Sequence, residues 1–193
     1  MRIPPFLPNY VSVTFYRRHL PHLYRIGQPV FLTWRLHGSL PPHRSFPQKS
    51  ITSGKAFAAM DRLLDETRSG PFYLRRPEIA DMVVETIHHN ANSLHRCELH
   101  AFVIMPNHVH LLATPHIPLP EFMKGLKGYT AKKANQMLGL TGNPFWQEES
   151  YDHLVRDASS AERVRRYIEQ NPVRAGLVSE PSQYRWSSAY SGK

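Results

Sequence analysis

The chain has 193 residues, 41% of them hydrophobic and 11% aromatic, which suits one globular domain with a core of its own. Its single cysteine, Cys97, excludes an internal disulfide and predicts a reducing, cytoplasmic location. Neither a bilayer-spanning apolar run nor a secretory signal is recognisable, so we expect no membrane partner. Twenty-four Lys and Arg residues against 15 Asp and Glu give a net charge of +9, which favours a polyanionic partner such as nucleic acid.

The first part of the chain is predicted to contain a basic arm followed by a folded domain. Residues 1–28 are rich in basic and aromatic side chains, and we assign them to an arm that precedes a domain at residues 29–193. Residues 29–36, PVFLTWRL, are β-branched and aromatic and predict a strand. The Pro-, Ser- and Gly-rich residues 39–54 predict a loop.

Two helices are predicted after this loop. The second begins at Pro77 and Glu78, a pair that is typical of a helix N-terminus. Apolar residues recur at helical spacing in both segments. The apolar faces consist of Phe57, Met60 and Leu64 in the first helix and of Ile79, Val83, Ile87 and Leu94 in the second.

A β-hairpin is predicted where two apolar stretches, residues 98–105 and 108–114, are separated only by Pro106 and Asn107. Residues 121–137 then predict a helix, because their apolar residues recur at helical spacing. Its apolar side is predicted to contain Phe122, Leu126, Tyr129 and Met137.

The chain is predicted to close with a short strand and a helix. Residues 139–144 break the preceding helix, and residues 150–157 predict the strand. The last helix is expected to begin near Ser160 and to end by Asn171, because Pro172 disfavours the α conformation in the residue before it. This order of elements predicts an α+β fold, a ferredoxin-like antiparallel sheet with helices packed on one face.

Two histidines in the predicted hairpin are candidate metal ligands. Side chains alternate across a sheet, so His108 and His110 point to one face while Val109 points to the other. Two imidazoles side by side can hold a divalent cation. The chain has twelve histidines, however, and a bare His-x-His pair indicates a metal site only when a third ligand is found.

Tyr167 and Asn171 are candidate partners of the histidine pair. They are four residues apart in the last predicted helix and therefore share one helical face. The Asn171 carbonyl oxygen could complete a three-ligand site at the end of the helix, where the macrodipole favours a cation. Taken alone, this spacing is far more typical of a packed tyrosine followed by an Asn-Pro helix stop.

Three runs of the sequence carry a family resemblance: AFVIMPNHVHLLATP, FWQEESYDHLVRD and RRYIEQNPVRAGLV. Their order and spacing resemble the REP-associated tyrosine transposases of the HUH endonuclease superfamily, which are related to small single-tyrosine insertion-sequence transposases. The likeness covers residues 24–188. It implies the ferredoxin-like sheet already predicted, with the nucleophile on a helix.

The resemblance implies a role for each candidate residue. It places the histidine-hydrophobic-histidine motif on His108 and His110, the nucleophile on Tyr167, and the polar third metal ligand on Asn171. The ion would be Mg²⁺ or Mn²⁺. Relatives commonly have phenylalanine at the position of Tyr129, which is therefore not the expected nucleophile.

The implied partner is single-stranded DNA with hairpin-forming, palindromic repeats, which Tyr167 would cleave through a 5′-phosphotyrosine. Basic side chains are expected to follow the DNA backbone. We assign this role to Arg17, Arg18, Arg25, Lys127, Lys132, Arg163 and Arg166. Asp152 and His153 could support the site or merely pack, and both a monomer and a homodimer agree with the resemblance.

Two other functions remain open at this point. The chain could be a non-catalytic protein that binds single-stranded nucleic acid through its basic surface. It could also be a zinc-dependent hydrolase, which would need an Asp or Glu beside His108 and His110 and a water nucleophile.

Overall fold

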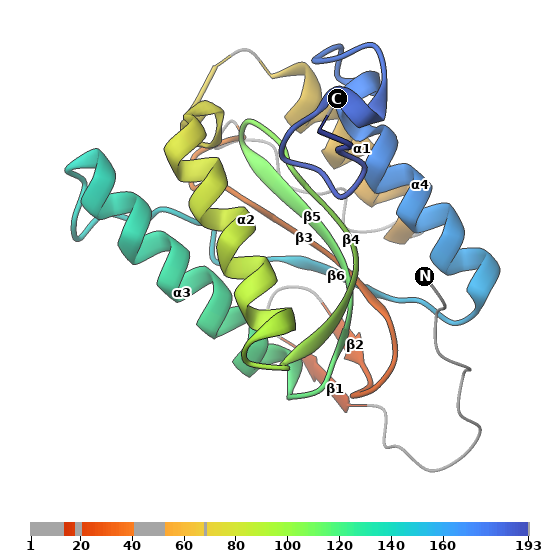
Figure 1. The fold of residues 1–193 in the computed structure, drawn as a ribbon. Coiled ribbons are helices and arrows are strands. Elements are labelled where there is room, and N and C mark those ends of the chain that lie inside the picture. Colours follow the sequence, from red (N-terminus) through yellow and green to blue (C-terminus); the bar gives the residue numbers. More distant parts are fainter. Residues whose placement is uncertain (1–13, 18–20, 41–52, 68, 193) are drawn as a thin grey trace.

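The computed structural model describes residues 14–17, 21–40, 53–67 and 69–192 (Figure 1). Within these residues, the strands are β1 (Thr14–Arg17), β2 (Pro21–Tyr24), β3 (Val30–Arg35), β4 (Cys97–Ile104), β5 (His108–Pro115) and β6 (Tyr151–Leu154). The helices are α1 (Ser53–Glu66), α2 (Pro77–Asn92), α3 (Leu119–Leu138) and α4 (Ala158–Arg174), with short 3-10 turns at Tyr73–Arg75 and Pro181–Gln183. No helix of the described part is long and apolar enough to cross a membrane.

The central sheet has the predicted ferredoxin-like topology. In the described residues, four strands form it in the order β4-β5-β3-β6, and each neighbouring pair is antiparallel. The first and third of these strands in chain order, β3 and β5, occupy the centre, and β4 and β6 form the edges. The α+β class, the hairpin of β4 and β5 and the short strand β6 are thus confirmed.

The helices cover both faces of the sheet, so the prediction of helices on one face is wrong (Figure 1). One face packs against α2 and α3 through residues that include Leu32, Leu111 and Leu126. The other face packs against α1 and α4 through residues that include Leu64 and Ile168. Every residue of β5 is buried, as expected of a central strand that has a helical layer on each side.

The predicted arm contains folded structure. β1 and β2 pair as an antiparallel hairpin, and Tyr24 is buried in the core cluster beneath α2 and α3. The Gly27 N–H donates to the Pro115 carbonyl at 2.9 Å, which ties this segment to the end of β5. Arg18 and residues 1–13 lie outside the described residues, and a domain boundary at residue 28 stays a prediction.

Helix α4 is longer than its sequence predicts. It continues through Pro172 to Arg174, whereas the X-Pro rule predicted an end by Asn171. Asn171 and Pro172 are buried against the sheet, and the Asn171 carbonyl still accepts a bond from the Ala175 N–H at 2.9 Å. Packing of this buried turn therefore outweighs the local preference, which is a bias and not a prohibition.

Three predicted apolar positions are exposed. Tyr129 and Met137 of α3 are 52% and 46% exposed, because the buried stripe of this helix runs through Phe122, Leu126 and Thr130. Leu94 is also exposed and lies beyond the end of α2. The assignment of Tyr129 and Met137 to the apolar side of α3 is therefore wrong.

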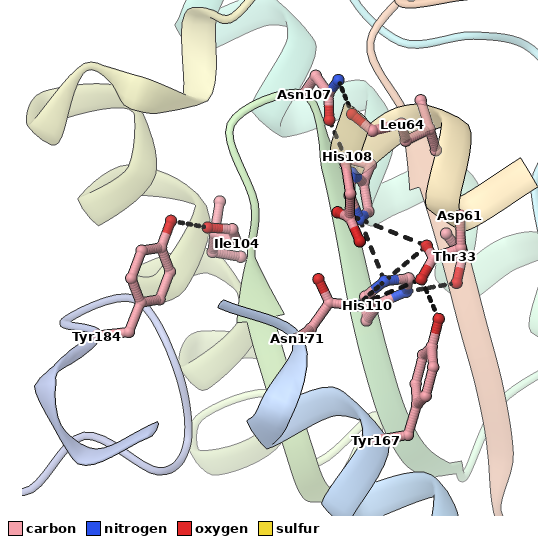
Figure 2. Close-up of polar contacts among 11 residues, drawn as sticks. Thr33, Asp61, Leu64, Ile104, Asn107, His108, His110, Tyr167, Asn171 and Tyr184 are labelled. Atoms are coloured by element: carbon pink, nitrogen blue, oxygen red, sulfur yellow. Dashed lines mark hydrogen bonds and ion pairs between the residues drawn. The ribbon is translucent and has the colours of Figure 1, made fainter. Parts of the chain in front are cut away.

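The carboxyl-terminal segment pairs with the outer edge of β4. The Ile104 N–H donates to the Trp186 carbonyl, and the Ser188 N–H donates to the Phe102 carbonyl, both at 2.9 Å. The Tyr184 hydroxyl also donates to the Ile104 carbonyl (Figure 2). This segment therefore continues the hydrogen bonding of the sheet beyond its last strand.

Candidate active site

The histidine pair lies at the start of the central strand β5, on the face covered by α1 and α4. His108 and His110 are both fully buried, and their Nε2 atoms are 3.1 Å apart (Figure 2). Alternation along the strand gives this arrangement, because Val109 points into the opposite core. The predicted juxtaposition of the two imidazoles is therefore present.

Neighbouring polar groups orient the two rings. The Asn107 amide donates through Nδ2 to the Leu64 carbonyl at 2.9 Å, which leaves its Oδ1 to accept from His108 Nδ1 at 2.7 Å. His108 therefore carries its proton on Nδ1 and presents an Nε2 lone pair to the site. Thr33 Oγ1 lies 2.7 Å from His110 Nδ1 and holds the second ring in the same way.

Asp61 of α1 completes a group that could hold a metal ion, the one such group found among the described residues. Its Oδ1 atom lies 3.0 Å from His110 Nε2 and 3.5 Å from His108 Nε2. Asp61 was not predicted as a ligand from the sequence. Asp61 stands in the apolar stripe of α1 between Phe57 and Leu64, and an acidic side chain at such a position is a signal that could have found it.

Asn171, the predicted third ligand, also reaches the site. Its Nδ2 lies 3.3 Å from His110 Nε2 and 3.2 Å from Asp61 Oδ2. Its Oδ1 is buried and accepts no hydrogen bond from the described residues, and the same is true of Oδ1 in Asp61 and Asp65. A half-turn of the Asn171 amide exchanges its nitrogen and oxygen. Buried carboxylate and amide oxygens beside two imidazole nitrogens fit a hard divalent cation.

Tyr167 stands one helical turn before Asn171 and points into the same site (Figure 2). Its hydroxyl donates a hydrogen bond to Asp61 Oδ2. Its ring makes edge contacts with Phe31 and Phe57, with centroids 6.1 and 6.0 Å apart, and with His110 at 5.8 Å. The phenol oxygen is thus fixed next to the cluster of ligand atoms.

Burial and neighbouring polar groups together set the protonation states of Asp61, His108 and Tyr167. Burial lowers the pKa of His108 to about 3, helped by His110 and opposed by Asp61, so this imidazole is neutral and able to bind metal. Burial opposes ionisation of Asp61, but the two imidazoles and the Tyr167 hydroxyl hold its pKa well below the usual range. Burial and the Asp61 charge raise the pKa of Tyr167, which is therefore a protonated phenol at neutral pH.

A second acidic side chain of α1 lies at the edge of the site. Asp65 Oδ1 is 4.0 Å from His108 Nε2. Burial and the neighbouring Asp61 charge raise the pKa of Asp65 to about 7. A bound cation would favour the ionised forms of both carboxyl groups beside the histidine pair.

The basic residues predicted to contact DNA lie in separate places. Arg163 and Arg166 of α4 line a hollow of about 460 Å³ that Tyr167 also borders. Lys127 and Lys132 belong to α3, on the opposite side of the sheet, and Lys127 Nζ donates to the Gln147 and Glu148 carbonyls, each at 2.8 Å. The remaining three are Arg17 in β1, the half-buried Arg25 and Arg18, which lies outside the described residues.

Asp152 and His153 lie on the edge strand β6 and pair with Leu32 and Phe31 of β3. Neither belongs to the metal-ligand group. His153 is exposed, and Asp152 is half-buried. They therefore lie outside the cluster formed by the histidine pair, and their supporting role stays a prediction.

The fold and the site define the class of protein: a ferredoxin-like domain in which two histidines of a central strand face a tyrosine on a helix. Residues 73–171, just over half of the chain, match the family described as "Transposase IS200 like". The chain belongs to this family. The match contains the histidine pair, Tyr167 and Asn171, whereas Asp61 precedes it.

Two individual similarities agree with this membership. The chain is 38% identical over 73 residues to the ISDra2 transposase TnpA of Deinococcus radiodurans, an alignment that covers 34% of this chain and 51% of that protein. The chain thus spans about half the length of this curated relative. A solved structure of a REP-associated tyrosine transposase bound to a REP hairpin has the same fold, with a TM-score of 0.55, 18% identity, and coverage of 90% of this chain and 81% of that one.

Proposed function

We propose that the chain is a metal-dependent endonuclease and strand transferase that cuts single-stranded DNA beside hairpin-forming, palindromic repeats through a 5′-phosphotyrosine intermediate. One observation carries the proposal: in a member of a transposase family, the Tyr167 phenol meets a buried cluster of Asp61, His108 and His110. The hairpin substrate is proposed by analogy with the structural relative, which is bound to a REP hairpin.

The proposed ligands of the cation are His108, His110 and Asp61, with Asn171 as a further oxygen ligand. When bound, Mg²⁺ or Mn²⁺ would polarise the scissile phosphate and offset its negative charge. The protein supplies the neutral His108 imidazole and the ionised Asp61 carboxylate side by side with the His110 ring. Asp61 has two tasks, since Oδ1 faces the imidazoles while Oδ2 accepts the hydrogen bond from Tyr167 and orients the phenol.

In the proposed reaction, the Tyr167 oxygen forms a bond to phosphorus while the bond from phosphorus to the 3′ oxygen breaks. The phenol loses its proton, and the departing 3′ oxygen gains one, so the step is neutral in protons. One phosphodiester replaces another, and a 3′-hydroxyl can therefore reverse the reaction without a new source of energy. A phenolate is a better leaving group than an alkoxide, which favours rejoining.

Of the basic residues predicted to contact DNA, those at the hollow beside Tyr167 are the best placed. Arg163 and Arg166 border it together with Gln170, and a strand bound at Tyr167 would pass over this face of α4. Lys127 donates hydrogen bonds to the Gln147 and Glu148 carbonyls, so we assign it a structural role instead of a DNA contact. A chromosomal substrate would place the enzyme in the cytoplasm, and the proposal is compatible with a monomer or a homodimer.

Covalent trapping tests this proposal. Purified protein, Mn²⁺ or Mg²⁺ and single-stranded oligonucleotides from palindromic repeats flanking the gene are run on a denaturing gel. We expect a metal-dependent protein–DNA band that disappears in Tyr167→Phe and persists in Tyr129→Phe, the matched control on the exposed side of α3. Binding without an adduct would support the non-catalytic alternative, and an adduct in Tyr167→Phe would refute the choice of nucleophile.

A zinc-dependent hydrolase is the second candidate, because Asp61 provides the acidic third ligand that such an enzyme needs. Family membership and the position of Tyr167 favour the transferase. Stoichiometric zinc in the purified protein, together with DNA hydrolysis that survives Tyr167→Phe, would favour the hydrolase.

A further inference from the structure

Because α4 continues past Asn171 to Arg174, the Arg174 side chain lies over the ring of Tyr167. The two residues are seven apart, which places them on one face of a continuous helix two turns long. The Arg174 guanidinium carbon lies 4.8 Å from the centroid of the phenol ring. Had the helix ended at Asn171, as the position of Pro172 predicts, this stacking would be lost.

Arg174 differs from the other arginines of α4 in its contacts. Arg163 donates to the hydroxyls of Ser159 and Ser160, and Arg165 is bound by Glu162 and Glu169. Arg166 lies 3.6 Å from Glu162. Within the part of the chain that the structure describes, the Arg174 guanidinium has no hydrogen bond or ion pair, and its contact there is the stack on the Tyr167 ring. A guanidinium carries five N–H donors that can bind an anion.

The charges around Tyr167 show what Arg174 could bind. On one side of the phenol lies Asp61, whose Oδ2 accepts the hydrogen bond from the hydroxyl, and Asp65 of the same helix lies at the edge of the site. The positive guanidinium of Arg174 lies over the ring of the phenol. A phosphate attached to the phenol oxygen would be repelled by both carboxylates, and Arg174 is placed to bind it.

We propose that Arg174 binds the phosphate that becomes joined to Tyr167, stacking on the phenol ring while its N–H groups hold the non-bridging oxygens. This inference rests on the proposed function, in which that phosphate is the scissile group of DNA. A guanidinium suits the task, because its planar fork donates two parallel hydrogen bonds to a phosphate and stacks on an aromatic ring. Arg174 lies beyond the residues that match the family, so the match does not assign it.

The first test measures the single-turnover rate of adduct formation at saturating DNA. For Arg174→Gln we expect a loss of roughly 100-fold with little change in DNA affinity, because the contact forms with the reacting phosphate alone. Arg174→Lys should recover part of the rate, because it restores the charge without the planar fork. Arg76→Gln, a matched loss of an exposed arginine at the start of α2, should react at the wild-type rate.

A rate for Arg174→Gln within about twofold of wild type would overturn the proposal. The proposal would also be overturned if Arg174→Gln weakened DNA affinity as much as it slowed adduct formation. A lowered melting temperature that accounts for the slower reaction would overturn it as well. Arg174 is exposed and has no hydrogen bond or ion pair with the described residues, so the variant is expected to fold normally.

A second readout does not depend on turnover. Inorganic phosphate should raise the melting temperature of wild type and Arg76→Gln but not of Arg174→Gln. An equal shift in all three proteins, or none in any, would overturn the anion site at Arg174. If wild type forms no adduct while the phosphate effect is lost in Arg174→Gln alone, the proposed function fails and the anion site stands.

Discussion

Replacing Asp65 with asparagine is expected to stabilise the metal-free protein at neutral pH and to change little near pH 4. The Asp65 carboxyl is 16% exposed, and none of the described residues donates a hydrogen bond to its buried Oδ1. Burial and the Asp61 charge raise its pKa from 3.8 to about 7. In the unfolded chain the carboxyl loses its proton near the lower value, whereas in the folded protein it keeps the proton until the higher one.

The magnitude follows from linkage between protonation and folding. Below about pH 4 both states bind the proton, and the contribution of Asp65 to the pH dependence is zero. Between about pH 4 and pH 7 only the folded state binds it, so the free energy of unfolding falls as the pH rises, by about 4 kcal/mol in total. Above about pH 7 the loss is complete and remains constant.

The assay is urea denaturation in EDTA at about pH 4.5 and pH 8, with wild type and Asp65→Asn compared at each pH. Comparison of the two proteins cancels the titration of all groups that they share. Glu66→Gln is the matched control, because Glu66 is the next residue of α1 and its side chain is 65% exposed. The difference in the free energy of unfolding between wild type and Glu66→Gln should show no comparable dependence on pH.

A difference between wild type and Asp65→Asn that is the same at both pH values would refute the reasoning. It would mean that Asp65 is ionised in the folded protein throughout this range. Added Mn²⁺ provides a further check, because a bound cation favours the ionised carboxylate and should reduce the difference at pH 8.

Three other predictions test the metal site, the core and a helix end. Mn²⁺ at about 100 times its Kd should raise the free energy of unfolding by ~2.7 kcal/mol in urea titrations, and Asp61→Asn should lose most of this gain. Equal stabilisation of the variant would exclude Asp61 as a ligand. Ile168→Ala should lower the free energy of unfolding by about 2–5 kcal/mol, because Ile168 of α4 is fully buried in the core between this helix and the sheet. Gly139→Ala should cost about 1 kcal/mol, because Gly139 ends α3 with a φ of 68°, and an unchanged melting temperature would contradict this.

Local periodicity was sufficient to predict most of the fold and part of the site. Alternation along β5 correctly predicted that His108 and His110 share one face of the sheet. Helical spacing correctly predicted that Tyr167 and Asn171 share one face of α4. The two pairs meet because α4 packs on the face of the sheet that carries the histidines. Spacing alone does not determine that packing, and the family resemblance supplied it.

The contribution of α1 could not be predicted in the same way. Asp61 is separated from His108 by a whole helix and a strand, and no local pattern links the two residues. The stripe of Phe57, Asp61 and Leu64 marks a buried carboxylate but does not identify its partners. The prediction that the last helix ends by Asn171 was also wrong. It used only the local preference of the residue before Pro172, whereas tertiary packing determines the conformation of this turn.

The pairing of the carboxyl-terminal segment with β4 has a consequence for how the protein is handled. Phe102 and Ile104 belong to an edge strand, and their backbone groups are bonded to Trp186 and Ser188 instead of standing open to another chain. Unpaired strand edges recruit further strands and promote aggregation. Variants shortened before Trp186 would therefore expose the backbone groups of Phe102 and Ile104 to pairing with another chain.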